Sequence, residues 1–293
     1  MDSILKRAML ACAVLCATVG TVRAGGLVQP VFDLADFTTP LAITNSYWPL
    51  AVGRQVVYFE ASDDECIVND FVVTDQTKAF GGDYAGLVAR VISDKEWLDA
   101  DCDGGRDVLL EDTFDWYAQD NAGNVWYFGE DTTEFLFDDA GNPAGSSKLG
   151  SWEAGVDGAV AGLIMLAQPA SGLFYRQEFY AGFAEDEAKI IGTDRPVSIG
   201  IGDFDGCIVI KEWTALERGT LEHKSYCPDV GLVLVEKFGG GKPAAVEAVD
   251  LGLPETRKRG QVHLHASGRL GLCEGRGRDD VAPEPALTRF LQL

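Results

Sequence analysis

The stretch DWYAQDNAGNVWYFGED, from Asp115 to Asp131, contains the pattern that decides the fold. Two segments rich in aromatic residues flank the sequence Asp-Asn-Ala-Gly, in which Gly123 suits the left-handed position of a tight turn. The same turn chemistry returns in DDAGN, at residues 138–142. The spacing predicts two successive β-hairpins, whose Gly and Asn residues are explained by backbone geometry alone.

The side chains of the first hairpin are less easily explained. Alternation along a strand places Asp115 and Tyr117 on one face and Trp116 on the other, while Trp126 and Tyr127 point to opposite faces of the second strand. A sheet with one wet and one dry face would alternate more cleanly. We expect this hairpin to be buried on both sides or to line a concave site.

The chain around the hairpin repeats the strand pattern. Short runs of β-branched and aromatic residues are separated by Gly, Asp, Asn or Pro at hairpin distances, and no dozen residues form a helical stripe. The runs are RQVVYF (54–59), IVNDFVV (67–73), GLVARVIS (86–93), NVWYFG (124–129), CIVIKEW (207–213) and GLVLVEKF (231–238). The prediction is an all-β fold: a single antiparallel β-barrel or strongly curved meander sheet of roughly 10–14 strands over residues 45–238.

The two ends of the chain differ from this domain. Residues 1–24 resemble a secretory signal peptide, with Lys6 and Arg7, an apolar run too short to cross a bilayer, and small residues before the expected cleavage after Ala24. Residues 25–44 are expected to be a lead-in segment that packs on the domain through Phe32, Leu34 and Phe37. Residues 239–293 begin with GGGKPAA and show no apolar period, which predicts a flexible or disordered tail.

The formal charge of the chain is −22. The leader contains Lys6, Arg7, Arg23 and Asp2, a net +2, so its removal would leave −24. Such a surface repels phosphate backbones, which argues against nucleic acid as a partner. No stretch after the leader approaches the ~20 apolar residues of a membrane-spanning helix. We expect a soluble extracytoplasmic protein, periplasmic or secreted, whose partner is a small molecule or none.

An acidic loop is the sharpest local motif. Asp99, Asp101 and Asp103 place oxygen ligands at alternate positions before Gly104, and Asp107 follows, as in calcium-binding loops. The final bidentate Glu is displaced to Glu111, and no helices flank the loop. The pattern predicts a rearranged calcium site or, alternatively, a merely solvated acidic turn.

The cysteines indicate disulfides, as is usual for exported proteins. Cys207 and Cys227 lie at similar distances from the turn at residues 217–219, which suits a cross-strand bridge. If the strand that begins near Cys66 pairs with the strand that ends near Ser93, the acidic loop returns Cys102 towards Cys66. We predict the pairs Cys66–Cys102 and Cys207–Cys227; buried free thiols are the alternative.

Five blocks of the sequence resemble an exported bacterial protein family: NSYWPLAVGRQVVY (45–58), EDTFDWYAQDNAGNVWYFGEDT (111–132), GSWEAGVDGAVAGLIM (150–165), YRQEFYAGFAED (175–186) and EWTALERGTLEHKSYCPDVGLV (212–233). The acidic loop and the basic tail depart from the family pattern. The resemblance implies a bacterial, extracytoplasmic β-protein, and it brings no catalytic residue with it.

The residues leave three function classes open. The preferred hypothesis is a binding module for a small polar, aromatic or cationic ligand, in which Tyr117 and Trp126 stack the ligand while Asp115, Glu153 and Arg176 orient it. A glycosidase-like hydrolase would need two carboxylates beside an aromatic platform such as Trp116 or Trp126. A structural extracytoplasmic protein would show no pocket. We expect no positioned catalytic base, because His223 is the sole histidine outside the tail and alternates with polar neighbours on a strand.

Overall fold

A computed structural model describes residues 26–62, 65–239 and 244–252 of the chain. The described part contains fifteen β-strands and two short 3-10 helices, and no helix in it is long and apolar enough to cross a membrane. The helices are η1 (Leu34–Asp36) and η2 (Gly82–Tyr84). The strands are β1 (Gln55–Ala61), β2 (Cys66–Ala79), β3 (Val88–Asp99), β4 (Val108–Gln119), β5 (Val125–Phe137), β6 (Pro143–Ser147), β7 (Trp152–Glu153), β8 (Val160–Met165), β9 (Phe174–Arg176), β10 (Glu178–Phe179), β11 (Asp186–Ile199), β12 (Gly202–Thr214), β13 (Leu221–Cys227), β14 (Gly231–Phe238) and β15 (Ala244–Gly252).

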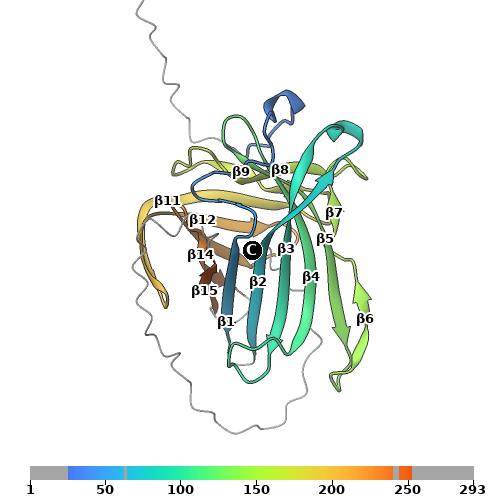
Figure 1. Cartoon of the computed structure of the whole chain (residues 1–293), viewed down its shortest axis with the longest axis vertical. Helices are drawn as coiled ribbons and strands as arrows, with labels where there is room; N and C mark the ends of the chain where they lie inside the picture. The colour runs from blue at the N-terminus through green and yellow to red at the C-terminus, as the bar shows by residue number, and fades with distance from the viewer. Residues whose placement is uncertain (1–25, 63–64, 240–243, 253–293) are drawn as a thin grey trace, which may run out of the picture.

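The strands form one antiparallel sheet that rolls into a nearly closed barrel (Figure 1). Its order is β10-β8-β5-β4-β3-β2-β1-β15-β14-β13-β12-β11-β9, with β6 and β7 added beside β5. The ends of the order are adjacent in the chain, because Gln177 alone separates β9 from β10. β9 pairs with β11 and β10 pairs with β8, so one short segment joins both edges of the sheet. The predicted all-β, barrel-like fold is confirmed.

The hairpins follow the turn chemistry of the sequence. Gly123 adopts a φ of 95° between β4 and β5, and its backbone N–H donates to the Asp120 carbonyl at 3.0 Å. Gly141 adopts a φ of 78° at the turn between β5 and β6. Both are left-handed positions that suit Gly because it has no Cβ.

The boundary of the domain lies farther along the chain than we predicted. β15 belongs to the segment that we assigned to the tail, yet it pairs with β1 on one side and β14 on the other. It thereby joins the β1–β5 half of the sheet to the β11–β14 half. The domain therefore continues past the expected end at residue 238. The sequence AAVEAVDLG did not predict this strand, because it contains few β-branched and aromatic residues. The predicted leader, and the tail beyond Gly252, lie outside the described residues.

The interior is defined by side chains that meet across the barrel. The Trp48 ring contacts Phe71 of β2, Tyr117 of β4 and Tyr226 of β13 in edge-on geometry, at centroid distances of 5.6–5.9 Å. β13 is far from β2 and β4 in the sheet order, so the faces that carry Phe71, Tyr117 and Tyr226 point inward.

The lead-in segment covers the opposite face of the β4–β5 hairpin. The Phe37 ring packs edge-on against Trp126 at 5.6 Å, and the Phe32 ring packs against Phe128 at 6.0 Å. This part of the prediction is confirmed, although Leu34 is exposed. The hairpin is therefore buried on both sides, the first of the two expectations for it.

Candidate functional site

The five predicted ligand-binding residues do not converge. Trp126 lies on the face covered by the lead-in segment, where its indole N–H donates to Asp120 at 2.9 Å. Glu153 pairs with Lys78 at 2.8 Å, and Arg176 pairs with Glu187 at 3.3 Å and stacks on Phe179. The cleft that we predicted around them is wrong in this arrangement, because partners that the sequence could not identify already occupy these charged groups.

Asp115 and Tyr117 do share the interior face, as predicted. The Tyr127 hydroxyl donates to Asp115 at 2.8 Å, and the Tyr127 ring stacks on Tyr117 at 4.9 Å. Burial raises the pKa of Asp115, and the nearby charge of Asp94 raises it further. Together these contacts form a packed polar–aromatic layer.

The aromatic platforms expected for glycoside hydrolysis are also buried. Trp116 packs against Phe80 at 5.9 Å and lies under the Lys78 ammonium at 4.6 Å. Trp126 is enclosed by Phe37 and Phe128. A sugar cannot stack on either indole in this conformation, so the structure removes both candidate platforms.

The strongest candidate site is a cavity of about 80 Å³ between the β11–β13 wall and the β5–β10 side of the barrel. We call it the acidic cavity, because six carboxylates and one lysine line it. The charged lining residues are Glu130, Glu178, Asp186, Glu212, Glu217, Glu222 and Lys224.

Strand register brings the charges of one wall together. Asp186 pairs with Thr214, Glu212 pairs with Glu222, and Lys224 pairs with Ile210. Directly paired residues lie on the same face of a sheet, and alternation along each strand repeats that face every second residue. The side chains of Asp186, Glu212, Glu222 and Lys224 therefore all face the interior.

Lys224 is the centre of this wall and is almost completely buried, with its side chain 4% exposed. Its ammonium lies 3.0 Å from a Glu212 oxygen and 3.4 Å from a Glu222 oxygen. The Tyr226 hydroxyl donates to the other Glu212 oxygen at 3.1 Å. Burial lowers the pKa of Lys224, but the charges of Glu212 and Glu222 outweigh it, so the net shift is upward. The lysine is charged and already neutralised.

Asp186 titrates near neutral pH. Burial raises the pKa of Asp186 to about 6, Lys224 opposes the shift, and the charge of Glu212 adds to it. The cavity therefore gains negative charge as the pH rises through about 6.

The sequence analysis missed this wall, although EHKSYC contained its signal. Period-2 alternation places Glu222, Lys224 and Tyr226 on one face of β13 and His223 on the other. His223 packs against Phe238 at 4.6 Å on that second face. The indication available in the sequence was that Lys224 shares a strand face with Tyr226, which suggests a charge among interior side chains.

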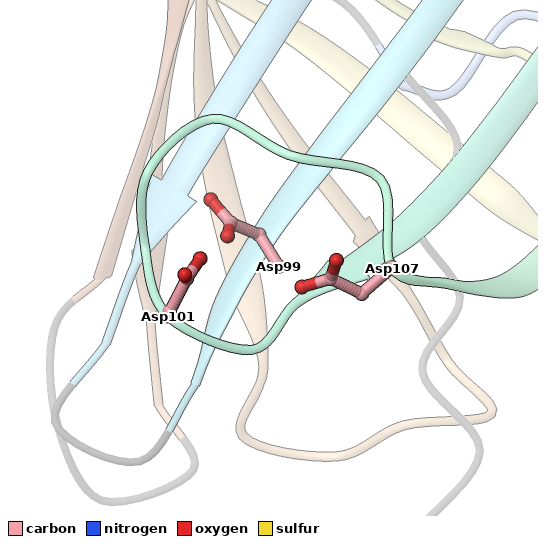
Figure 2. A group of neighbouring side chains, drawn as sticks. All are labelled: Asp99, Asp101 and Asp107. Atoms are coloured by element: carbon pink, nitrogen blue, oxygen red, sulfur yellow. The ribbon is translucent and has the colours of Figure 1, made fainter.

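The acidic loop, residues 99–107, joins β3 to β4 and is a separate cluster. Oxygens of Asp99, Asp101 and Asp107 all lie within 4.8 Å of one another, and Figure 2 shows the three carboxylates pointing towards the inside of the loop. Asp99 accepts backbone hydrogen bonds from Asp103 and from Gly104 at 3.2 and 2.7 Å.

The other two predicted calcium ligands lie differently. The side chain of Asp103 does not belong to the group of three. Glu111 lies within β4, where it accepts a hydrogen bond from Thr113 at 2.7 Å and where burial raises its pKa. Glu111 also lies outside the group of three, and its assignment as a ligand stays a prediction.

Both predicted disulfides are present. Cys66–Cys102 ties the acidic loop to the start of β2, and Cys207–Cys227 links β12 to the end of β13, with Cα–Cα distances of 5.4 and 4.1 Å. Bridges of this kind form and persist in oxidising compartments.

Comparisons with known proteins find weak structural likenesses. No family model and no curated protein matches the chain. A solved structure described as a candidate exported protein with a YmcC-like fold, from Bacteroides fragilis, is 15% identical with a TM-score of 0.35; the match covers 71% of this chain and 99% of that one. A candidate lipoprotein from Parabacteroides distasonis is 11% identical with the same TM-score, and covers 71% and 98%. At these values the likenesses assign neither a function nor a site.

Proposed function

We propose that the protein is an exported β-domain that binds a small organic cation in the acidic cavity. The observation that carries the proposal is the charge of the lining, six carboxylates against one lysine. That lysine is neutralised by Glu212 and Glu222. An added cation would reduce the repulsion that Asp186 experiences from Glu212 and Glu222, which water screens poorly inside a barrel.

The size of the cavity limits the group that can enter it. To hold one water molecule, a cavity needs about 10–15 Å³ of space that the centre of a water-sized sphere can reach. The volume of about 80 Å³ therefore accommodates a few non-hydrogen atoms. An ammonium or guanidinium head group fits within it.

The two disulfides and the leader-like N-terminus support export. The excess of negative charge supports a cationic partner over an anionic one.

Isothermal titration of the protein with methylammonium at pH 7.5 tests the proposal, with acetate as the anionic control. We expect saturable binding of methylammonium alone. Glu222→Gln should weaken it about tenfold or more, because the variant removes one negative charge from the lining and leaves the Lys224 ammonium to repel the added cation.

Glu236→Gln is the matched control, because Glu236 is exposed on β14, paired with the outward-facing His223. It removes the same charge outside the cavity and should leave the affinity unchanged. Equal affinities for both variants, or the absence of saturable binding by the unaltered protein, would refute the proposal.

A second candidate is a calcium ion in the acidic loop, favoured by the convergence of Asp99, Asp101 and Asp107. Oxygen ligands from carboxylates suit calcium, and the Cys66–Cys102 disulfide restrains the loop. The repulsion of Asp103 raises the pKa of Asp101, and the charges of Asp107 and Asp99 add to it. A bound cation would relieve this repulsion.

Calcium at tenfold excess over its dissociation constant should stabilise the folded protein by about 1.4 kcal/mol. Thermal unfolding of chelator-treated protein, with and without added calcium at constant ionic strength, measures the effect. Asp107→Asn should abolish it, and Asp131→Asn, on β5, should retain it. An unchanged melting temperature on addition of calcium would exclude the site.

A further inference from the structure

The acidic cavity has two chemically different ends. Phe183 and Leu216 line it and remain 52% and 45% exposed, so they form its solvent-facing rim. Glu212 is buried and Asp186 is half-buried, and their carboxylates form its floor. Exposed apolar side chains at the mouth of a charged cavity are a surface that a ligand can cover.

The rim and the floor follow from the same two chain segments. Phe183 lies three residues before Asp186, in the loop that enters β11, and Leu216 lies four residues after Glu212, in the turn that leaves β12. In both segments the apolar residue lies at the mouth of the cavity and the acidic residue lies inside it. The Phe183 ring is also held in place, because it stacks on Tyr180 at 4.6 Å.

A buried hydroxyl lies beside the floor. Tyr175 is 2% exposed, and among the described residues its hydroxyl has no hydrogen-bond partner. Tyr175 pairs with Ala188, which pairs with Glu212, so the three side chains share the interior face. Burial raises the pKa of Tyr175, and the nearby charge of Glu212 raises it further. The phenol therefore remains neutral behind the floor, outside the residues that line the cavity.

These observations specify the donors and the shape of the occupant. A primary ammonium has three N–H donors, and the floor offers the carboxylate oxygens of Asp186 and Glu212. A quaternary ammonium has no N–H and would give the carboxylate oxygens of the floor no hydrogen bond, which is costly. The rim offers nothing to a bare inorganic ion, but it can cover an alkyl chain.

Building on the proposed function, we infer that the occupant is a primary amine at the end of an apolar chain. The ammonium enters first and binds on the carboxylate floor, while Phe183 and Leu216 cover the methylenes at the mouth. The same chemistry exists in free alkylamines and in lysine side chains of polypeptides.

A titration series of methyl-, butyl- and hexylammonium tests the inference on the whole chain at pH 7.5. Each methylene that the rim covers should raise the affinity about fourfold. Hexyltrimethylammonium should bind at least tenfold more weakly than hexylammonium.

Phe183→Ser and Leu216→Ser are two independent variants of exposed side chains, and circular dichroism checks their fold. Each should reduce the preference for hexyl- over methylammonium by about tenfold while the affinity for methylammonium stays unchanged. Val249→Ser is the matched control, because Val249 is an exposed apolar residue of β15 outside the cavity lining.

The outcomes separate the inference from the proposed function. Equal binding of the three amines, unaffected by the rim variants, would overturn the inference and leave the cation site standing. If the unaltered protein does not bind methylammonium, both the inference and the proposed function are overturned. Nα-acetyl-lysine N-methylamide distinguishes the two sources: binding tighter than that of butylammonium assigns the amine to a polypeptide lysine, and weaker or equal binding assigns it to a free alkylamine.

Discussion

The acidic cavity and the acidic loop contain the same kind of side chain in two different environments. In the loop, Asp101 is exposed, and the charges of its neighbours raise its pKa. In the cavity, burial is the first cause of the raised pKa of Asp186, and a buried lysine opposes it. Water stabilises the exposed loop carboxylates of Asp101 and Asp107, whereas the protein itself must stabilise those in the cavity.

The difference decides what each region can bind. Converging carboxylates of which two are exposed suit a hard ion that keeps some of its water. Desolvated carboxylates beneath an apolar rim favour an organic cation that can leave water behind. The same difference predicts how strongly changes in each region affect stability.

The largest expected effect is the loss of the buried counter-charge. Lys224→Met should destabilise the protein by about 3–5 kcal/mol, because it leaves Glu212 and Glu222 without their ammonium partner in the interior. Urea denaturation followed by tryptophan fluorescence measures the change. Lys148→Met is the surface control, because its pair with Asp131 is more than half exposed. It should cost less than about 1 kcal/mol. Similar losses in both variants would mean that the interior charges are solvated.

Removal of either disulfide should reduce stability by a smaller amount, and removal of the first should also change calcium binding. Replacement of both Cys66 and Cys102 by Ala removes a link between residues 36 apart, and the same change at Cys207 and Cys227 removes a link between residues 20 apart. Each should cost about 2–4 kcal/mol. The first replacement alone should weaken calcium binding, because it releases the acidic loop, and calorimetric titration of both proteins checks this. Equal calcium affinities would show that the loop geometry does not depend on its disulfide.

The smallest expected effect concerns pH. Burial raises the pKa of Asp186 to about 6, so between roughly pH 4 and 6 the folded state binds a proton that the unfolded chain has released. The free energy of unfolding should therefore fall as the pH rises through this window and level off above it. Urea denaturation between pH 4 and 7.5 measures the slope.

Asp186→Asn should flatten this slope, and Asp131→Asn should leave it unchanged. A slope that both variants share would assign the pH dependence to the overall charge of the protein and not to the cavity.

The local chemistry of the chain was predictable from the sequence. The β4–β5 turn follows from Gly123, and strand alternation predicts that Asp115 and Tyr117 share a face. The pairing of Cys207 with Cys227 could be predicted because a hairpin places residues equally far from its turn opposite each other, and that of Cys66 with Cys102 because the acidic loop follows the strand that pairs with β2. Turn geometry and period-2 alternation act over a few residues, so one sequence suffices to predict them.

The tertiary structure alone decided which charges meet. Arg176 pairs with Glu187 across β9 and β11, and Lys224 meets Glu212 across β12 and β13, because the register of each strand pair sets these neighbours. β15 joins the halves of the barrel although its own residues have weak strand propensity, since pairing with β1 and β14 compensates for it. The acidic cavity exists because the sheet closes, and closure brings together residues that lie up to about 90 positions apart in the chain, such as Glu130 and Glu222. No local pattern of residues encodes that proximity.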